Sequence, residues 1–133
     1  MTAEIRVLDA SVGVKWFREE RGSARAVELL HDAASGALRV VVPTHFAHET
    51  LSVIGREGGG SSIVRAWDII VESGVDIVPL TEEVVREAAS QCDLLRCSFY
   101  DALAPAVASL LGATLVSADF KAHSAYPGVE LIG

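Results

Sequence analysis

The chain has 133 residues, half of them hydrophobic, and a formal net charge of −7 from 18 acidic and 11 basic residues. This length suits a single domain, 1–133, that buries about two thirds of the surface its unfolded chain would expose. The excess of acid excludes the broad basic surface by which many nucleic-acid-binding domains hold their ligand. Binding of nucleic acid stays possible where a bound divalent metal supplies positive charge for a phosphate.

Neither a membrane segment nor an export signal is indicated. No apolar run approaches the ~20 residues needed to cross a bilayer. The N-terminal stretch MTAEIRVLDASV lacks the basic start and apolar core of a signal peptide. Cys92 and Cys97 match neither a zinc-site spacing nor a disulfide framework, and we interpret them as reduced thiols. We therefore expect a cytoplasmic protein that does not contact a membrane.

Short apolar runs alternate with longer helical patterns from one end of the chain to the other. The runs predict strands at 5–9, 39–43, 75–80, 114–119 and 129–132. The longer patterns predict helices at 23–35, 44–56, 61–73, 81–95 and 98–112. This alternation is typical of βαβ units, and near-continuous apolar strands favour a parallel sheet covered on both faces. We expect a three-layer α/β/α sandwich with a mainly parallel central sheet and an αα-hairpin insertion around residues 44–73.

Four acids stand where a charge is unfavourable. Asp9 and Asp119 each end a predicted strand, Glu49 lies at the edge of an apolar helical stripe, and Asp101 is the only charged residue in 98–112. Ligands of open α/β sheets bind outside the carboxyl ends of the strands. If the strands that precede Asp9 and Asp119 are neighbours, both carboxylates project into one crevice.

Carboxylates gathered in one crevice repel each other unless a cation or protons neutralise them. Mg²⁺ or Mn²⁺ prefers such oxygen ligands, keeps several waters and bridges to substrate phosphates. A bound metal lowers the pKa of its water and stabilises charge on a phosphate under attack. The predicted chemistry is hydrolysis of a phosphodiester, with Ser11 and Ser117 orienting waters or the ligating carboxylates.

Each acid also has a purely structural interpretation. Asp9 and Asp119 are favoured residues at a helix N-cap. Asp101 follows Ser98 by three residues and fits a capping box. Glu49 can pair with Arg56 or with a nearby lysine on the rim. From the residues alone these alternatives stay open.

Three stretches together resemble the PIN-domain nucleases, in particular the VapC-type toxins of bacterial toxin–antitoxin pairs. VLDASVGVKWF resembles the opening strand of that family, and VPTHFAHETLSVI resembles the segment that carries its second acid. FYDALAPAVASLLGATLVSAD resembles the family's Tyr-Asp helix, which leads into a strand that ends in Thr/Ser-x-Asp. The resemblance covers essentially the whole chain.

The resemblance implies an Mg²⁺- or Mn²⁺-dependent endoribonuclease that forms a homodimer and is inhibited by a small cognate antitoxin. Carried over to this sequence, the metal-binding and catalytic acids are Asp9, Glu49, Asp101 and Asp119, with Ser117 as the strand-end hydroxyl. Contacts to RNA are expected from cations on elements that flank the crevice. These are Lys15, Arg18, Arg21 and Lys121.

Three departures from the family pattern bear on the site, and one of them is the strong acidity, which leaves few cations to hold RNA. Ser52 stands where many relatives carry asparagine, and Pro105 lies inside the predicted Asp101 helix. A proline there removes the hydrogen bond to the carbonyl four residues back, which is that of Asp101. Two alternatives therefore remain: an RNA-processing PIN nuclease that is not a toxin, and a catalytically silent PIN-like binding scaffold.

Overall fold

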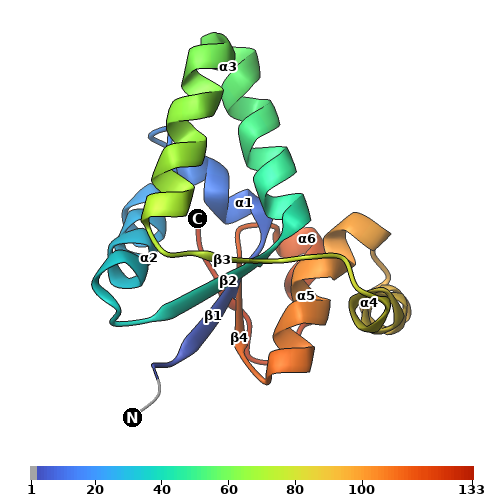
Figure 1. The fold of residues 1–133 in the computed structure, drawn as a ribbon. Helices are drawn as coiled ribbons and strands as arrows, with labels where there is room; N and C mark the ends of the chain where they lie inside the picture. Colours follow the sequence, from blue (N-terminus) through green and yellow to red (C-terminus); the bar gives the residue numbers. More distant parts are fainter. Residues whose placement is uncertain (1–2) are drawn as a thin grey trace.

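The five predicted strands form one sheet in the order β3-β2-β1-β4-β5, as described for residues 3–133 by the computed structural model (Figure 1). The strands are β1 (Ile5–Leu8), β2 (Arg39–Pro43), β3 (Asp76–Val78), β4 (Thr114–Ser117) and β5 (Glu130–Leu131). Each neighbouring pair in this described sheet runs parallel. The prediction of a mainly parallel sheet is confirmed.

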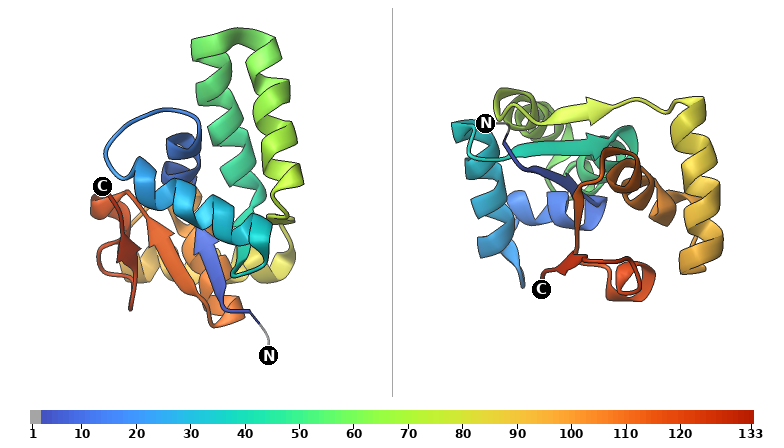
Figure 2. Two further views of the ribbon diagram at one scale, coloured as in Figure 1. Left: turned by 90° about the vertical axis from the view of Figure 1, so that its left-hand side faces the viewer. Right: turned by 90° about the horizontal axis from the view of Figure 1, so that it is seen from below.

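Helices cover both faces of the sheet, which gives the predicted three layers (Figure 2). They are α1 (Ala10–Gly13), the 3₁₀ helix η1 (Val14–Trp16), α2 (Ser23–Ser35), α3 (Thr44–Glu72), α4 (Glu82–Leu95), α5 (Phe99–Leu111) and α6 (Phe120–His123). Helices α1 and α2 lie on one face and α5 on the other, while α4 packs on the outer side of α5. The three-layer α/β/α architecture is thus confirmed.

Alternation along the strands divides the core in two. On β2, Val40 and Val42 are buried with Leu29 of α2 and Phe46 of α3. Between them, Val41 turns to the opposite face and is buried with residues of α4 and α5. Because successive side chains of a strand point to opposite faces, a strand buried on both sides must be apolar at every position.

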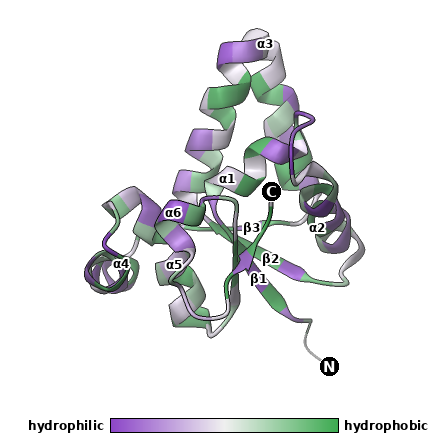
Figure 3. Cartoon of the chain, turned by 180° about the vertical axis from the view of Figure 1, so that it is seen from behind, coloured by the Kyte–Doolittle hydropathy of each residue, from purple (hydrophilic) through white to green (hydrophobic). Residues whose placement is uncertain are grey.

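The αα-hairpin around 44–73 is present as two arms of α3, which project from the sheet and turn at the three glycines (Figure 1). Gly59 has φ 77° and ψ −173°, a conformation open to glycine that breaks the helix. Near the tip, a Cβ on Gly55 would stand 2.6 Å from the side chain of Ile63, so glycine permits the close approach of the arms. Hydrophilic residues gather toward the tip (Figure 3).

Helix α5 runs without interruption through Pro105, which is buried inside it. Ser98 caps the N-terminus of the helix, since its Oγ accepts a hydrogen bond from the backbone N–H of Asp101 at 3.1 Å.

In residues 3–133 no single helix has the length and apolarity to cross a membrane; α4 and α5 meet that test only together, as a pair bent by 111°.

Candidate active site

The four predicted acids line one pocket of about 440 Å³ at the carboxyl ends of the central strands. Asp9 follows β1 and Asp119 follows the neighbouring strand β4, and the Asp9 N–H donates to the carbonyl of Val116 at 3.0 Å. Glu49 enters the pocket from α3 and Asp101 from α5. Four segments that are distant in sequence thus deliver one carboxylate each to a single cleft.

Asp9 is buried, and one of its two oxygens is used structurally. Oδ2 accepts hydrogen bonds from the N–H and the hydroxyl of Ser11, at 3.1 and 2.7 Å, and so caps α1. The Ser11 hydroxyl also accepts from the N–H of Ala118 at 3.0 Å, which links the ends of β1 and β4. Among the described hydrogen bonds none uses Oδ1 of Asp9, so the capping role leaves one oxygen available.

The carboxylate of Asp119 likewise uses one of its two oxygens for a structural hydrogen bond. Its Oδ1 caps α6 by accepting from the N–H of Ala122 at 3.0 Å, and no hydrogen bond made by residues 3–133 uses Oδ2. Its own N–H donates to the Oγ of Ser117, also at 3.0 Å. The structural interpretation of both aspartates is therefore correct as far as it goes, but it accounts for only half of each carboxylate.

A fully buried histidine, His123, connects the two acids on the β4 side of the pocket. Its Nδ1 lies 2.6 Å from Ser117 Oγ, and its Nε2 lies 2.6 Å from the backbone oxygen of Asp101. Because a carbonyl oxygen only accepts, Nε2 carries the proton, and in the neutral ring Nδ1 accepts from the Ser117 hydroxyl. A chain of hydrogen bonds thus runs from the Asp119 N–H through Ser117 and His123 to Asp101.

Pro105 explains why the Asp101 carbonyl needs this donor. Proline has no N–H, so the helical partner that residue 105 would offer to Asp101 is missing. His123 supplies the hydrogen bond from α6 instead. The Asp101 carboxylate takes part in none of the hydrogen bonds or ion pairs found among residues 3–133, so only the Ser98 half of the expected capping box is formed.

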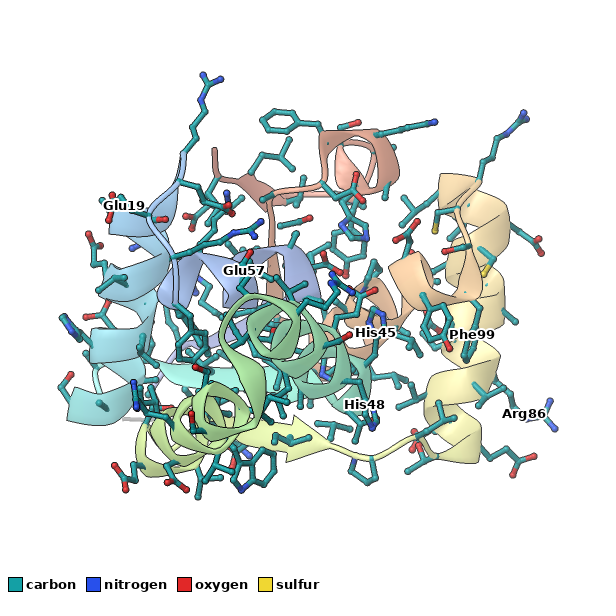
Figure 4. All side chains as sticks on the ribbon, turned by 90° about the horizontal axis from the view of Figure 1, so that it is seen from above. Glu19, His45, His48, Glu57, Arg86 and Phe99 are labelled. Carbon is teal, nitrogen blue, oxygen red and sulfur yellow. The ribbon has the colours of Figure 1, made fainter. Side chains whose placement is uncertain are left out.

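The α3 side of the pocket is more open. Glu49 is 55% exposed, and its Oε1 lies 3.1 Å from Nε2 of the buried His45, in a geometry that is not a hydrogen bond. His45 also stacks on Tyr100 of α5, with ring centroids 4.8 Å apart. Figure 4 shows His45 between α3 and α5. At the pocket, α3 thus contacts α5 through the stack of His45 on Tyr100.

One arginine lines the same pocket without neutralising its acids. Arg56 donates from Nη1 to the Oγ of Ser52 at 3.4 Å, although the sequence suggested that it pairs with Glu49. No lysine or arginine within residues 3–133 forms an ion pair with any of the four acids. Burial raises the pKa of the Cys97 thiol to about 11, and the nearby charges of Cys92, Asp101 and Asp119 raise it further. The negative field of the pocket therefore extends to Cys97.

The donor set fits a hydrated divalent metal. Within residues 3–133, no three histidine, cysteine or carboxylate side chains already stand at the spacing of a bound cation. Mg²⁺ keeps several waters and needs only one or two carboxylates directly, so a wide pocket lined by oxygens suits it better than a tight protein cage. The unused oxygens of Asp9, Asp101 and Asp119 are the ones available to it.

The expected RNA contacts fall into two groups. Lys15 is not exposed as an RNA contact would require. It is buried, and its Nζ pairs with Glu20 Oε1 at 3.1 Å and contacts the Arg21 carbonyl. The segment after η1 folds back over this ammonium, and a buried charge needs such partners. Arg18 is engaged with Glu20 and Glu57.

Arg21 and Lys121 are exposed and form no ion pair in the part of the chain that the structure describes. Lys121 lines a smaller notch beside the pocket, together with Arg96, Asp101 and Asp119. The sequence suggested Arg56 only as a partner of Glu49, and it assigned no role to His123 or Arg96. His123 and Arg96 carry no local sequence signal for a role at the pocket.

Comparison with known families bears on this arrangement. The sequence matches the PIN domain family over residues 6–126. The chain belongs to the PIN domain family. No curated protein matches the sequence.

Solved structures share this PIN fold over nearly their whole length. The VapC20 toxin of Mycobacterium tuberculosis, described as cleaving the sarcin–ricin loop, is 22% identical with a TM-score of 0.73, over 96% of this chain and 99% of that chain. A toxin–antitoxin complex from Klebsiella pneumoniae is 15% identical with a TM-score of 0.74, over 93% and 94%. VapBC2 of Rickettsia felis, bound to a DNA fragment from its promoter, is 16% identical with a TM-score of 0.71, over 96% of each chain. At these identities the likeness shows the fold.

Proposed function

We propose that this PIN domain is an Mg²⁺- or Mn²⁺-dependent endoribonuclease and the toxin of a toxin–antitoxin pair. The observation that carries the proposal is the gathering of Asp9, Glu49, Asp101 and Asp119 in one pocket, where no lysine or arginine of residues 3–133 pairs with them. Mutual repulsion makes this arrangement unfavourable unless a cation binds there. The sarcin–ricin loop cleaved by the VapC20 relative supports RNA as the substrate class.

Each acid has a distinct part in the proposal. Asp9 and Asp119 hold the metal through the oxygen that their structural hydrogen bonds leave free, Asp101 through its unbonded carboxylate, and Glu49 completes the oxygen set from α3. When bound, the metal provides an activated water and stabilises charge on the phosphate. Ser11 fixes the Asp9 carboxylate by a hydrogen bond, and Ser117 fixes the backbone at Asp119, so both carboxylates are oriented before a metal arrives.

The proposed partners follow from the relatives. Toxin–antitoxin assemblies recur among the structures that share the fold, from Klebsiella pneumoniae, Rickettsia felis and Salmonella typhimurium. We therefore propose a small cognate antitoxin that inhibits the chain. From the resemblance of the sequence to VapC-type toxins we also propose a homodimer as the working form and action in the cytoplasm.

RNA cleavage by the purified chain tests the proposed activity. We expect cleavage with Mn²⁺, none with EDTA, and none by Asp9→Asn with Mn²⁺. The matched control is Asp93→Asn, which removes one exposed carboxylate from α4 outside the pocket and retains activity. Cleavage by Asp9→Asn at the wild-type rate would place the activity elsewhere and overturn the proposal.

Two further outcomes separate the alternatives. A chain that cleaves RNA but does not arrest growth when expressed without its genomic neighbours is an RNA-processing nuclease and not a toxin. A chain that Mn²⁺ stabilises against heat but that cleaves no RNA is a silent binding scaffold.

A further inference from the structure

The cations of this acidic chain are distributed unevenly. Six of its eleven lysines and arginines form ion pairs with acids: Arg6, Lys15, Arg18, Arg25, Arg39 and Arg86. Of the five that form no ion pair among residues 3–133, three line the two adjoining pockets that share Asp101 and Asp119. These three are Arg56, Arg96 and Lys121.

The notch formed by Arg96 and Lys121 is a separate hollow of about 270 Å³. Both side chains are exposed, and they come from different elements: Arg96 ends α4, and Lys121 lies in α6. Asp101 and Asp119 form the boundary with the larger pocket. An anion held in the notch would therefore lie directly beside the proposed metal site.

The backbone at Arg96 supplies a second, independent observation. Arg96 has φ 54° and ψ 50°, and it is the only residue other than glycine with positive φ in residues 3–133. Two other helices of this chain end in the same left-handed conformation, at Gly36 and Gly112. Glycine adopts that conformation without steric cost, whereas arginine does not. Glycine would be more stable at this position, so what arginine adds there is a charged side chain beside the pocket.

We propose that Arg96 and Lys121 form a phosphate-binding subsite for the nucleotide that adjoins the scissile phosphodiester. This inference rests on the proposed function and extends it to the path of the RNA. In this proposal the RNA strand passes over the acidic pocket, with Arg56 on the α3 side and the Arg96–Lys121 notch on the α6 side. Two cations at the notch offset the repulsion that a phosphate meets from the neighbouring carboxylates, and the arginine fork suits phosphate oxygens.

Binding of a fluorescein-labelled single-stranded RNA, measured by anisotropy with Ca²⁺ in place of Mg²⁺, tests the subsite. We expect Arg96→Gly to weaken binding about tenfold, as for loss of one charged hydrogen bond. The slope of log K against log salt should fall by about 0.7, the share of one phosphate contact on a single strand. Arg96→Lys should retain most of the affinity.

The choice of glycine removes the usual ambiguity about folding. Because glycine suits the left-handed conformation, Arg96→Gly should melt at or above the wild-type temperature while it binds RNA more weakly. Arg86→Ala is the charge-matched control, since Arg86 projects outward from α4 and pairs with Glu82 (Figure 4). It should bind RNA like the wild type.

Three results separate the possibilities. Wild-type affinity and slope in Arg96→Gly, or an equal loss in Arg86→Ala, would overturn the subsite. Displacement of the RNA by poly-glutamate at equal charge concentration, with the same dependence on Arg96, would assign the notch to an acidic peptide instead. RNA binding that depends on Arg96, in a wild type that cleaves nothing with Mn²⁺, would support the subsite and contradict the proposed nuclease activity.

Discussion

Two regions of this PIN domain treat their acids in opposite ways. Between α2 and β5, Glu130 receives both a 2.7 Å and a 3.1 Å hydrogen bond from Arg25, which holds the pKa of that carboxyl below its usual range. In the pocket at the strand ends, Asp9, Asp101 and Asp119 have neither lysine nor arginine as an ion-pair partner among residues 3–133. Seven of the fourteen acids outside the pocket form an ion pair with lysine or arginine in residues 3–133, and none of the four acids in the pocket does, although these four lie together.

The comparison also shows how each region is held in place. Arg25 connects α2 to the edge strand by a direct charge pair. In the pocket, the Ser11 hydroxyl bonds the Asp9 carboxylate, and the chain from Ser117 through His123 bonds the backbone of Asp119 and Asp101. The carboxylates of Asp9 and Asp119 are held by the Ser11 hydroxyl and by backbone N–H groups, so their charge is not compensated by a cation of the chain.

The largest expected effect is on catalysis. Asp119→Asn keeps the shape of the side chain and can still cap α6, but it removes one charge from the proposed metal site. We expect RNA cleavage with Mn²⁺ to fall on the order of 10³-fold, comparable to loss of one electrostatic stabiliser of a transition state. Glu130→Gln removes a paired acid outside the pocket and should cleave at the wild-type rate. An equal loss of RNA cleavage in Asp119→Asn and Glu130→Gln would mean that the pocket acids have no special role in catalysis.

The second effect concerns the hydrogen-bond chain. His123→Ala leaves the Ser117 hydroxyl and the Asp101 carbonyl without their partner, and each buried group left unsatisfied costs about 1–3 kcal/mol. We expect the free energy of unfolding in urea to fall by about 3 kcal/mol.

A double-mutant cycle with Pro105→Ala shows whether proline creates the need for the histidine. Pro105→Ala restores an N–H that can bond the Asp101 carbonyl within α5. His123→Ala should therefore cost about 1 kcal/mol less in that background than in the wild type. Additive effects would mean that the hydrogen bond from His123 to the Asp101 carbonyl does not compensate for the proline.

The third effect is stabilisation by metal. A ligand at 100 times its dissociation constant stabilises the folded state by about 2.7 kcal/mol. We expect Mn²⁺ to raise the melting temperature of the wild type and of Glu130→Gln by the same amount, and that of Asp101→Asn by less. An equal gain in Asp101→Asn would remove Asp101 from the proposed ligands.

The sequence predicts the strand-end part of the site well. An apolar run that ends in aspartate marks the carboxyl end of a strand, and parallel pairing then brings Asp9 and Asp119 together. The order of the strands in the sheet was not predictable, since no local pattern specifies which strands are neighbours. The fold class was predictable because the alternation of short apolar runs and helical segments spans the whole chain.

The remainder of the site depends on tertiary contacts. The burial of Lys15 was not predictable, because it arises where the following segment folds back and pairs the ammonium with Glu20. The relation of Pro105 to His123 links residues 18 positions apart in the sequence and is visible only once α6 packs against α5. The left-handed backbone at Arg96 carries no sequence signal, because that conformation normally selects glycine.

The smallest expected effect is the pH dependence of the paired region. Hydrogen bonds from Arg25 lower the pKa of Glu130, so this pair stabilises the fold above the unfolded carboxyl pKa and the contribution is lost as pH falls through the lowered folded value. The gain is expected to stay below about 1 kcal/mol, because both partners are partly open to solvent. Urea melts of wild type and Glu130→Gln should therefore differ at neutral pH and converge in acid. If the difference persists in acid, Glu130 stabilises β5 through packing and not through its charge, and the contrast with the pocket would lie in geometry alone.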